Sequence, residues 1–88
     1  MHWVQNAEYK KEYEIQIEFE DGSIRSVNLE GYLGKGIFIP LKDLNNFKKF
    51  QVNHDTDTIE WYNGADLSPE FLYEIGKPLA QTSNVACL

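Results

Sequence analysis

Asn63, Asp66 and Glu70 are the side chains best suited to acid–base chemistry, and Trp61 precedes them closely. Two carboxylates beneath an aromatic ring could exchange protons with a bound small molecule. The same residues also have a structural interpretation. Asp66 would organise the turn after Asn63-Gly64, and Glu70 would complement a helix N-terminus. We favour the structural role and keep a small-molecule site or enzyme at Asn63, Asp66 and Glu70 as the alternative.

Other residue types that can do chemistry are present, but their spacing is unsuitable. His54, Asp55 and Asp57 share one short loop, which supplies too few convergent ligands for a metal ion. The glycines between residues 31 and 36 are not followed by the Lys-Ser/Thr pair of a phosphate loop. We therefore expect no metal, no cofactor and no enzymatic activity.

The charge balance bears on partners. Fourteen acidic against eight basic residues give a net charge of -6, which disfavours direct binding to nucleic acid. The acidic surface either maintains solubility or binds a small basic protein. The single cysteine, Cys87, cannot form an intrachain disulfide, and no apolar run is long enough for a membrane span. We expect a cytoplasmic protein without a membrane partner.

The first half of the chain predicts a β-hairpin. Apolar residues alternate with acidic ones from Tyr13 to Phe19, which is typical of a strand with one buried face. A loop of three residues, 20–22, with Gly22 at positive φ would place Ile15 opposite Val27 and keep the apolar residues of both strands on one face. We expect residues 3–9 to form a neighbouring strand, with a turn at Lys10-Lys11.

The second half predicts another hairpin and a helix. Residues 47–52 and 58–62 can pair so that Val52 faces Ile59 and Phe50 faces Trp61. Between the hairpins, the sequence predicts a short apolar strand end at residues 37–40 and one helical turn at residues 41–46. Ser68 is a suitable N-cap, and the residues after it predict a helix of about two turns that ends at Gly76.

The expected architecture is therefore α+β, with a small, mostly antiparallel β-sheet of hairpins and a short C-terminal helix. Residues 1–76 would form the single domain and residues 77–88 a flexible tail. A core of this size cannot bury every ring of the two tryptophans, five tyrosines and five phenylalanines. Some rings should therefore form an exposed aromatic patch, and the alternative is that they are scattered and half-exposed. The candidate partner-binding residues are Glu12, Glu14, Glu18, Glu20, Tyr32, Phe38, Trp61, Tyr62 and Asp66.

Several fragments together resemble a small bacterial family, the domain of unknown function 2442. They are Tyr13 to Phe19 with Asp21-Gly22, Val27-Asn28-Leu29, Gly36-Ile37-Phe38, Pro40 to Asp43, Phe47, Val52, Thr58 to Trp61, Asn63 to Glu70, and Leu72-Tyr73. The resemblance implies a small α+β domain without established catalytic residues. Some relatives carry a helix-turn-helix DNA-binding domain, and many are encoded beside another small protein, as in a toxin–antitoxin pair.

We therefore expect a noncatalytic protein-interaction module, resembling the antitoxin member of such a pair. Its acidic strand face and its aromatic patch are the two candidate docking surfaces. The partner would be a small basic protein, and a homodimer is the alternative.

Overall fold

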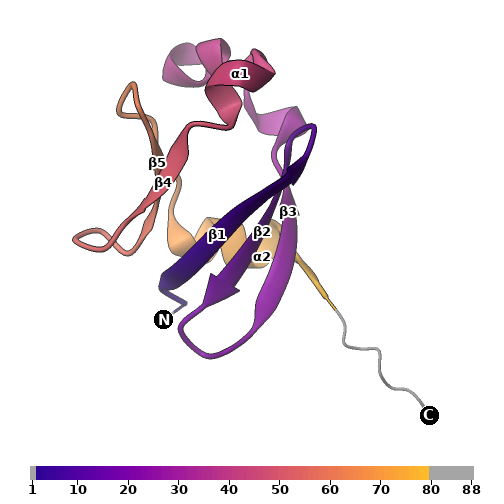
Figure 1. Cartoon of the computed structure of the whole chain (residues 1–88), viewed down its shortest axis with the longest axis vertical. Coiled ribbons are helices and arrows are strands. Elements are labelled where there is room, and N and C mark those ends of the chain that lie inside the picture. Colours follow the sequence, from indigo (N-terminus) through magenta and orange to yellow (C-terminus); the bar gives the residue numbers. More distant parts are fainter. Residues whose placement is uncertain (1, 80–88) are drawn as a thin grey trace.

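The computed structural model describes residues 2–79, which form an α+β fold of two antiparallel sheets and short helices (Figure 1). In chain order the elements are β1 (Val4–Lys11), β2 (Glu14–Phe19), β3 (Ile24–Asn28), the 3-10 helices η1 (Glu30–Tyr32) and η2 (Gly36–Lys42), α1 (Leu44–Phe47), β4 (Phe50–Asn53), β5 (Thr58–Trp61), α2 (Pro69–Ile75) and β6 (Lys77–Pro78). The larger sheet has the order β1-β2-β3-β6, and the smaller one is the β4-β5 hairpin. The predicted fold class is confirmed.

The register of the β2-β3 hairpin is the predicted one. Ile15 pairs with Val27, and the amide of Leu29 donates to the carbonyl of Tyr13 over 2.9 Å. Gly22 has φ +90°, a conformation that a residue with a Cβ atom rarely adopts. This register places the alternate residues Ile15, Ile17 and Phe19 in the core and turns the polar residues between them outward.

Strand β1 is longer than predicted and less regular. A register shift between Val4 and Asn6 inserts one residue, so that Val4 lies opposite Phe19 and Ala7 lies opposite Ile17. A β-bulge of this kind lets two apolar residues three positions apart face the same side of a sheet. The predicted turn at Lys10-Lys11 is wrong: both lysines belong to β1, and the turn falls at Glu12, which has φ +46°.

The β4-β5 hairpin also has the predicted register. Phe50 pairs with Trp61, and Val52 pairs with Ile59. After Trp61 the chain turns through Gly64, at φ +88°, and the amide of Trp61 donates to the carbonyl of Ala65. One pairing thus buries both Trp61 and Ile59 in the core.

Residues 37–40 differ from the prediction of a strand end. They lie within η2, where Ile37 is 47% exposed, Ile39 is 50% exposed and Leu41 is buried. Pro40 lacks an amide proton, which suits a short 3-10 segment better than the interior of a sheet. The helical turn predicted at residues 41–46 is present in part, because α1 begins at Leu44.

Helix α2 begins and ends where predicted. The hydroxyl of Ser68 accepts from the amides of Glu70 and Phe71, and Gly76 is the C-cap. Figure 1 shows α2 across the β1-β2-β3 sheet, and Leu72 is buried between them. Ordered structure continues beyond the predicted boundary at residue 76, because Lys77 and Pro78 pair with β3. The rest of the predicted tail, residues 80–88, lies outside the described residues.

The buried core joins both sheets to the helices. Its members are Val4, Ile15, Ile17, Phe19, Val27, Leu29, Leu33, Leu41, Phe47, Ile59, Trp61, Ala65 and Leu72. Across residues 2–79, no helix combines the length and the apolar character needed to span a membrane.

Candidate functional site

The outer face of the β1-β2-β3 sheet is polar because the pleat turns every second residue of β2 away from the core. Three cross-strand rows cover it, namely Asn6–Glu18–Ile24, Glu8–Gln16–Ser26 and Lys11–Glu14–Asn28. The side-chain amide of Asn6 donates to the carboxylate of Glu18 over 3.3 Å. Five residues of the first two rows, all except Ser26, line a shallow hollow of about 340 Å³ together with Ala7. The outer face is therefore a surface that three strands build, and Glu8, Glu14 and Glu18 are its carboxylates.

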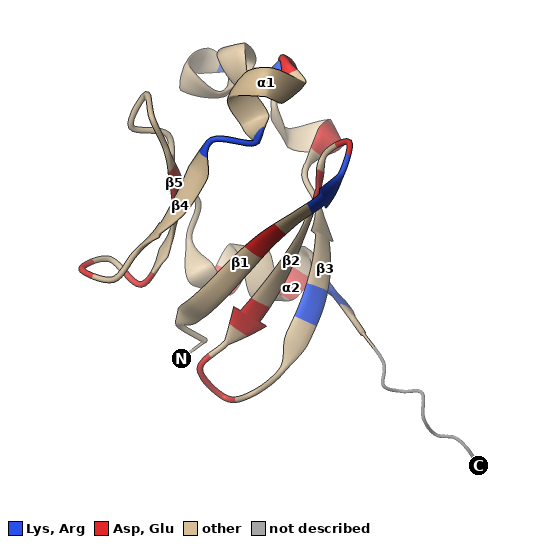
Figure 2. Cartoon of the chain, in the orientation of Figure 1, with Lys and Arg blue, Asp and Glu red and all other residues tan. Residues whose placement is uncertain are grey.

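The four glutamates predicted for this face do not all lie on a strand. Glu14 and Glu18 project from β2 and are half-exposed, whereas Glu12 and Glu20 lie in the turns at its two ends. None of the four forms an ion pair with another of the residues 2–79. Glu8 adds a carboxylate that the sequence pattern did not single out, and it pairs with Lys10 at 3.5 Å. Figure 2 shows acidic residues along β1, on β2 and in the connecting loops.

The predicted aromatic patch is not one surface. Trp61 is only 2% exposed, and its indole Nε1 donates to the carbonyl of Phe47 over 2.8 Å, so its assignment as a partner-binding residue is corrected. Phe38 is half-buried against the core. Tyr32 is 46% exposed and packs edge-on against Phe71, whereas Tyr62 is 60% exposed elsewhere.

Ile37, Ile39 and Tyr62 are instead the most exposed large apolar side chains of the described residues. We call these three residues the apolar patch. Ile37 and Ile39 lie in η2, and Tyr62 lies in the turn after β5. The side-chain amide of Asn63 connects these two segments by donating to the carbonyl of Ile37 over 2.8 Å. Sequence reasoning missed the two isoleucines because it interpreted residues 37–40 as a strand end. Their alternation around Phe38 was the available signal.

The alternative site at Asn63, Asp66 and Glu70 is not assembled as one pocket. The side chain of Asn63 already has structural partners, because it donates to the carbonyl of Ile37 and its oxygen accepts from the backbone amide of Ala65 over 3.1 Å. Asp66 is exposed and forms an isolated backbone bridge with Glu60. Glu70 lines a different hollow, to which neither Asn63 nor Asp66 contributes.

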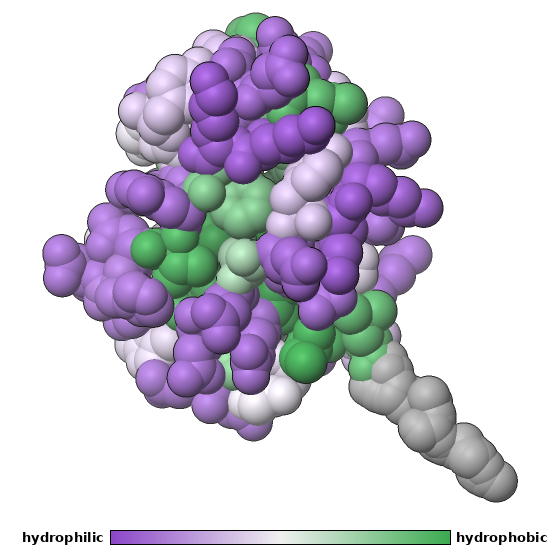
Figure 3. Space-filling view, viewed as in Figure 1, coloured by the Kyte–Doolittle hydropathy of each residue, from purple (hydrophilic) through white to green (hydrophobic). Residues whose placement is uncertain are grey.

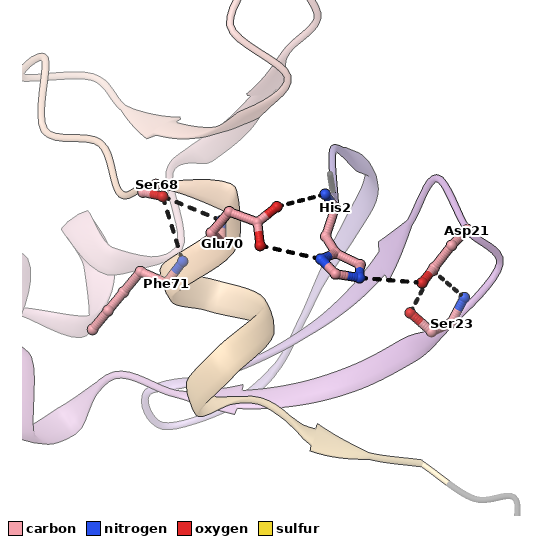
Figure 4. Close-up of polar contacts among 6 residues, drawn as sticks. All are labelled: His2, Asp21, Ser23, Ser68, Glu70 and Phe71. Atoms are coloured by element: carbon pink, nitrogen blue, oxygen red, sulfur yellow. Dashed lines mark hydrogen bonds and ion pairs between the residues drawn. The ribbon is translucent and has the colours of Figure 1, made fainter.

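Sequence reasoning missed a polar cluster around His2, which Figure 4 shows. The imidazole stacks on Tyr73, with ring centroids 3.5 Å apart and planes 17° apart. Its Nδ1 lies 3.1 Å from Glu70, its Nε2 lies 3.7 Å from Asp21, and the backbone amide of His2 donates to Glu70 over 2.7 Å. No sequence signal links residues that are this far apart along the chain.

The two carboxylates of the cluster are stabilised as anions. Hydrogen bonds from the side chain and the backbone amide of His2 lower the pKa of Glu70. The pKa of Asp21 is lowered by the hydroxyl and amide of Ser23, with a smaller contribution from His2. A carboxylate with a lowered pKa is a weaker base. The cluster is therefore better suited to fixing the N-terminal segment against α2 than to abstracting a proton.

Arg25 completes this cluster on the opposite face of Tyr73. Its guanidinium carbon lies 3.7 Å from the centre of the tyrosine ring, and one terminal nitrogen donates to the carbonyl of Gly76 over 3.0 Å. Two planar groups this close to one ring must lie on opposite faces, so Tyr73 is sandwiched between His2 and Arg25. A hollow of about 510 Å³ lies beside it, lined by Arg25, Glu70, Phe71, Tyr73 and Glu74.

The loop at residues 54–57 has the geometry of a capped turn. The side chain of Asn53 accepts from the amide of Asp55 over 2.8 Å, and Asp57 has φ +57°. Within residues 2–79, no three His, Cys, Asp or Glu side chains are grouped as metal ligands would be. Cys87 lies outside the described residues.

Comparison with known proteins identifies the family but no characterised relative. Neither the curated proteins nor the solved structures include a significant match to the chain. The family described as "Protein of unknown function (DUF2442)" matches residues 4–78, which span all the strands and helices of the structure. The chain therefore belongs to the DUF2442 family.

Proposed function

We propose that this protein is a noncatalytic interaction module that binds a small basic protein through the outer face of its larger sheet. The observation that carries the proposal is the set of glutamates on and beside β2, which form no ion pair within residues 2–79. Carboxylates that lack a cationic partner in the free protein remain available to cations on another molecule. The complex would be cytoplasmic and would resemble the antitoxin half of a toxin–antitoxin pair.

The shape of the face also supports a protein partner. It is a continuous three-stranded surface with a shallow hollow, and Ile24, at 38% exposure, adds an apolar contact at its edge. Interfaces between proteins combine apolar area with polar groups of this kind, whereas small molecules usually bind in more enclosed sites.

The test starts by capturing the partner from the native cell with tagged full-length protein. Affinity is then measured for the double variant Glu14→Lys/Glu18→Lys and for the control Asp55→Lys/Glu74→Lys. Asp55 in the β4-β5 loop and Glu74 on α2 are exposed residues outside the three rows of the outer face, and both doubles change the net charge equally. Each reversal removes an attraction worth about 0.2–1 kcal/mol and adds a repulsion, so the first double should bind about tenfold more weakly.

Salt provides the second measurement. Binding by the unmodified protein should weaken as salt is added, and the outer-face double should lose most of that dependence. Equal affinity of the two doubles would refute the proposal. If Ile39→Asp abolished binding instead, the apolar patch would be the docking surface.

A further inference from the structure

Two pairs of lysines that are distant in the sequence lie at the same end of the molecule. Lys10 and Lys11 end β1, and Lys48 and Lys49 connect α1 to β4 (Figure 2). The ammonium of Lys48 lies 5.4 Å from the ring centre of Tyr9, so it reaches across to β1. We call these four residues the lysine rim. They are half of the eight basic residues in a chain whose net charge is -6, and they make a local positive surface on an acidic protein.

An apolar strip lies below the lysine rim. Ala7 on β1 and Phe50 and Val52 on β4 contact the core but remain partly exposed. Figure 3 shows apolar atoms gathered over β4 and between β4 and β1 on the viewed face. The strip is exposed because β1 lies against the β4-β5 hairpin without pairing with it.

The backbone of β1 has no strand paired with it on the side of this strip, although β4 and β5 lie close to part of it. β1 is the outermost strand of its sheet. Its amide at Val4 donates to the carbonyl of Asp57 over 2.9 Å, and within residues 2–79 no other backbone hydrogen bond joins β1 to the smaller sheet. An edge of this kind can pair with an extended chain from another molecule.

We propose that the free edge of β1, from Gln5 to Lys11, binds an extended acidic–apolar segment of a partner protein. The segment would hydrogen-bond to the β1 backbone, place apolar side chains on the strip, and set carboxylates against the lysine rim. This surface differs from the outer face proposed for a basic partner by its apolar strip and by Lys48 and Lys49. The two surfaces meet at the end of β1, where Lys11 lies opposite Glu14 and Lys10 forms an ion pair with Glu8. Only Phe50 in the strip offers an aromatic ring on which a base could stack, whereas Ala7 and Val52 are aliphatic, so a peptide fits the strip better than a single-stranded nucleic acid.

The experiment uses eight-residue peptides, the length of β1, with Val, Ile or Phe at alternate positions and Thr between them. One set carries two glutamates at the N-terminus, a second carries them at the C-terminus, and a third carries two lysines instead. Binding to isotopically labelled full-length protein is followed by NMR. We expect a glutamate set to bind, to shift the amides of β1 and β4, and to slow hydrogen exchange along β1.

Charge reversal tests the role of the rim. The double variant Lys10→Glu/Lys49→Glu reverses one charge in each of the two lysine pairs of the rim. The control Lys35→Glu/Lys77→Glu makes the same change in net charge at exposed positions elsewhere. We expect the first double to bind the glutamate peptides about tenfold more weakly and the control to bind them normally. Circular dichroism is used to check that both doubles fold.

Three results would overturn the proposal. One is the absence of binding by both glutamate sets up to about 1 mM, in which case the lysines only protect the edge from unwanted pairing. Another is equal binding by the lysine set. The third is displacement of the peptides by an oligothymidylate at equal or lower concentration, which would assign the surface to nucleic acid.

Discussion

Replacing Trp61 with Phe tests how the smaller sheet is attached to the rest of the core. The indole of Trp61 is 2% exposed, and its N–H is the donor to the carbonyl of Phe47, where α1 ends. That carbonyl lies at a helix C-terminus and has no later helical amide to accept from. Phe keeps an aromatic ring between Phe47 and Phe50 but removes the donor.

The expected loss follows from these contacts. A buried carbonyl left without a donor costs about 1–3 kcal/mol. The lost atoms of the larger ring add about 1 kcal/mol in apolar contact and unfilled volume. Trp61→Phe should therefore lower the free energy of unfolding by about 2–4 kcal/mol, a large share of the roughly 5–15 kcal/mol typical of a small domain.

Urea unfolding followed by far-UV circular dichroism measures the effect without relying on the fluorescence of the tryptophan that is removed. Tyr62→Phe is the control, because Tyr62 is the next residue and is 60% exposed. It should change the free energy of unfolding by less than about 0.5 kcal/mol. A loss below about 1 kcal/mol for Trp61→Phe would show that the Phe47 carbonyl does not depend on the indole, and would refute the argument.

Two further predictions concern the start of α2. Ser68→Ala removes the acceptor for two helix amides and should lower the free energy of unfolding by about 1 kcal/mol in urea titrations. Ser68→Asp keeps an acceptor and should therefore retain most of the stability of the unmodified protein. Because the pKa of Glu70 is lower in the folded protein than its ordinary value of 4.5, its stabilising contribution is complete above that value and is lost as the pH falls through the folded pKa. Glu70→Gln should thus be less stable than the unmodified protein at pH 7, and its free energy of unfolding should fall less on acidification to about pH 3. If the free energies of unfolding of the two proteins fell equally with pH, the stabilisation of the Glu70 carboxylate by His2 would be contradicted.

Local patterns in the sequence predicted most of the regular structure. The alternation from Tyr13 to Phe19, with Gly22 in the loop, predicted the register of the first hairpin, and pairing of apolar residues predicted that of the second. The capping residue Ser68 predicted the start of α2. These signals are short-range, because a strand's pleat or a helix's first turn involves residues only a few positions apart.

The errors have physical causes that lie beyond such local patterns. The bulge in β1 allows Val4 and Ala7 to face the core together, which breaks the period of two on which strand prediction depends. Trp61 was assigned to the surface, but its indole packs against Phe47 of α1 and donates to the carbonyl of that residue, which places the side chain in the core. Composition alone cannot decide which aromatic residues are buried.

The amino-acid sequence by itself determined the α+β class, both hairpin registers and the limits of α2. Only the tertiary structure decided which charged and apolar side chains share a surface. It brought His2 to Glu70, joined Lys10 and Lys11 with Lys48 and Lys49 at one end, and set Ile37 beside the turn of Tyr62. The reason is that these neighbours come from different elements, and their proximity follows from how sheets and helices pack around the common core.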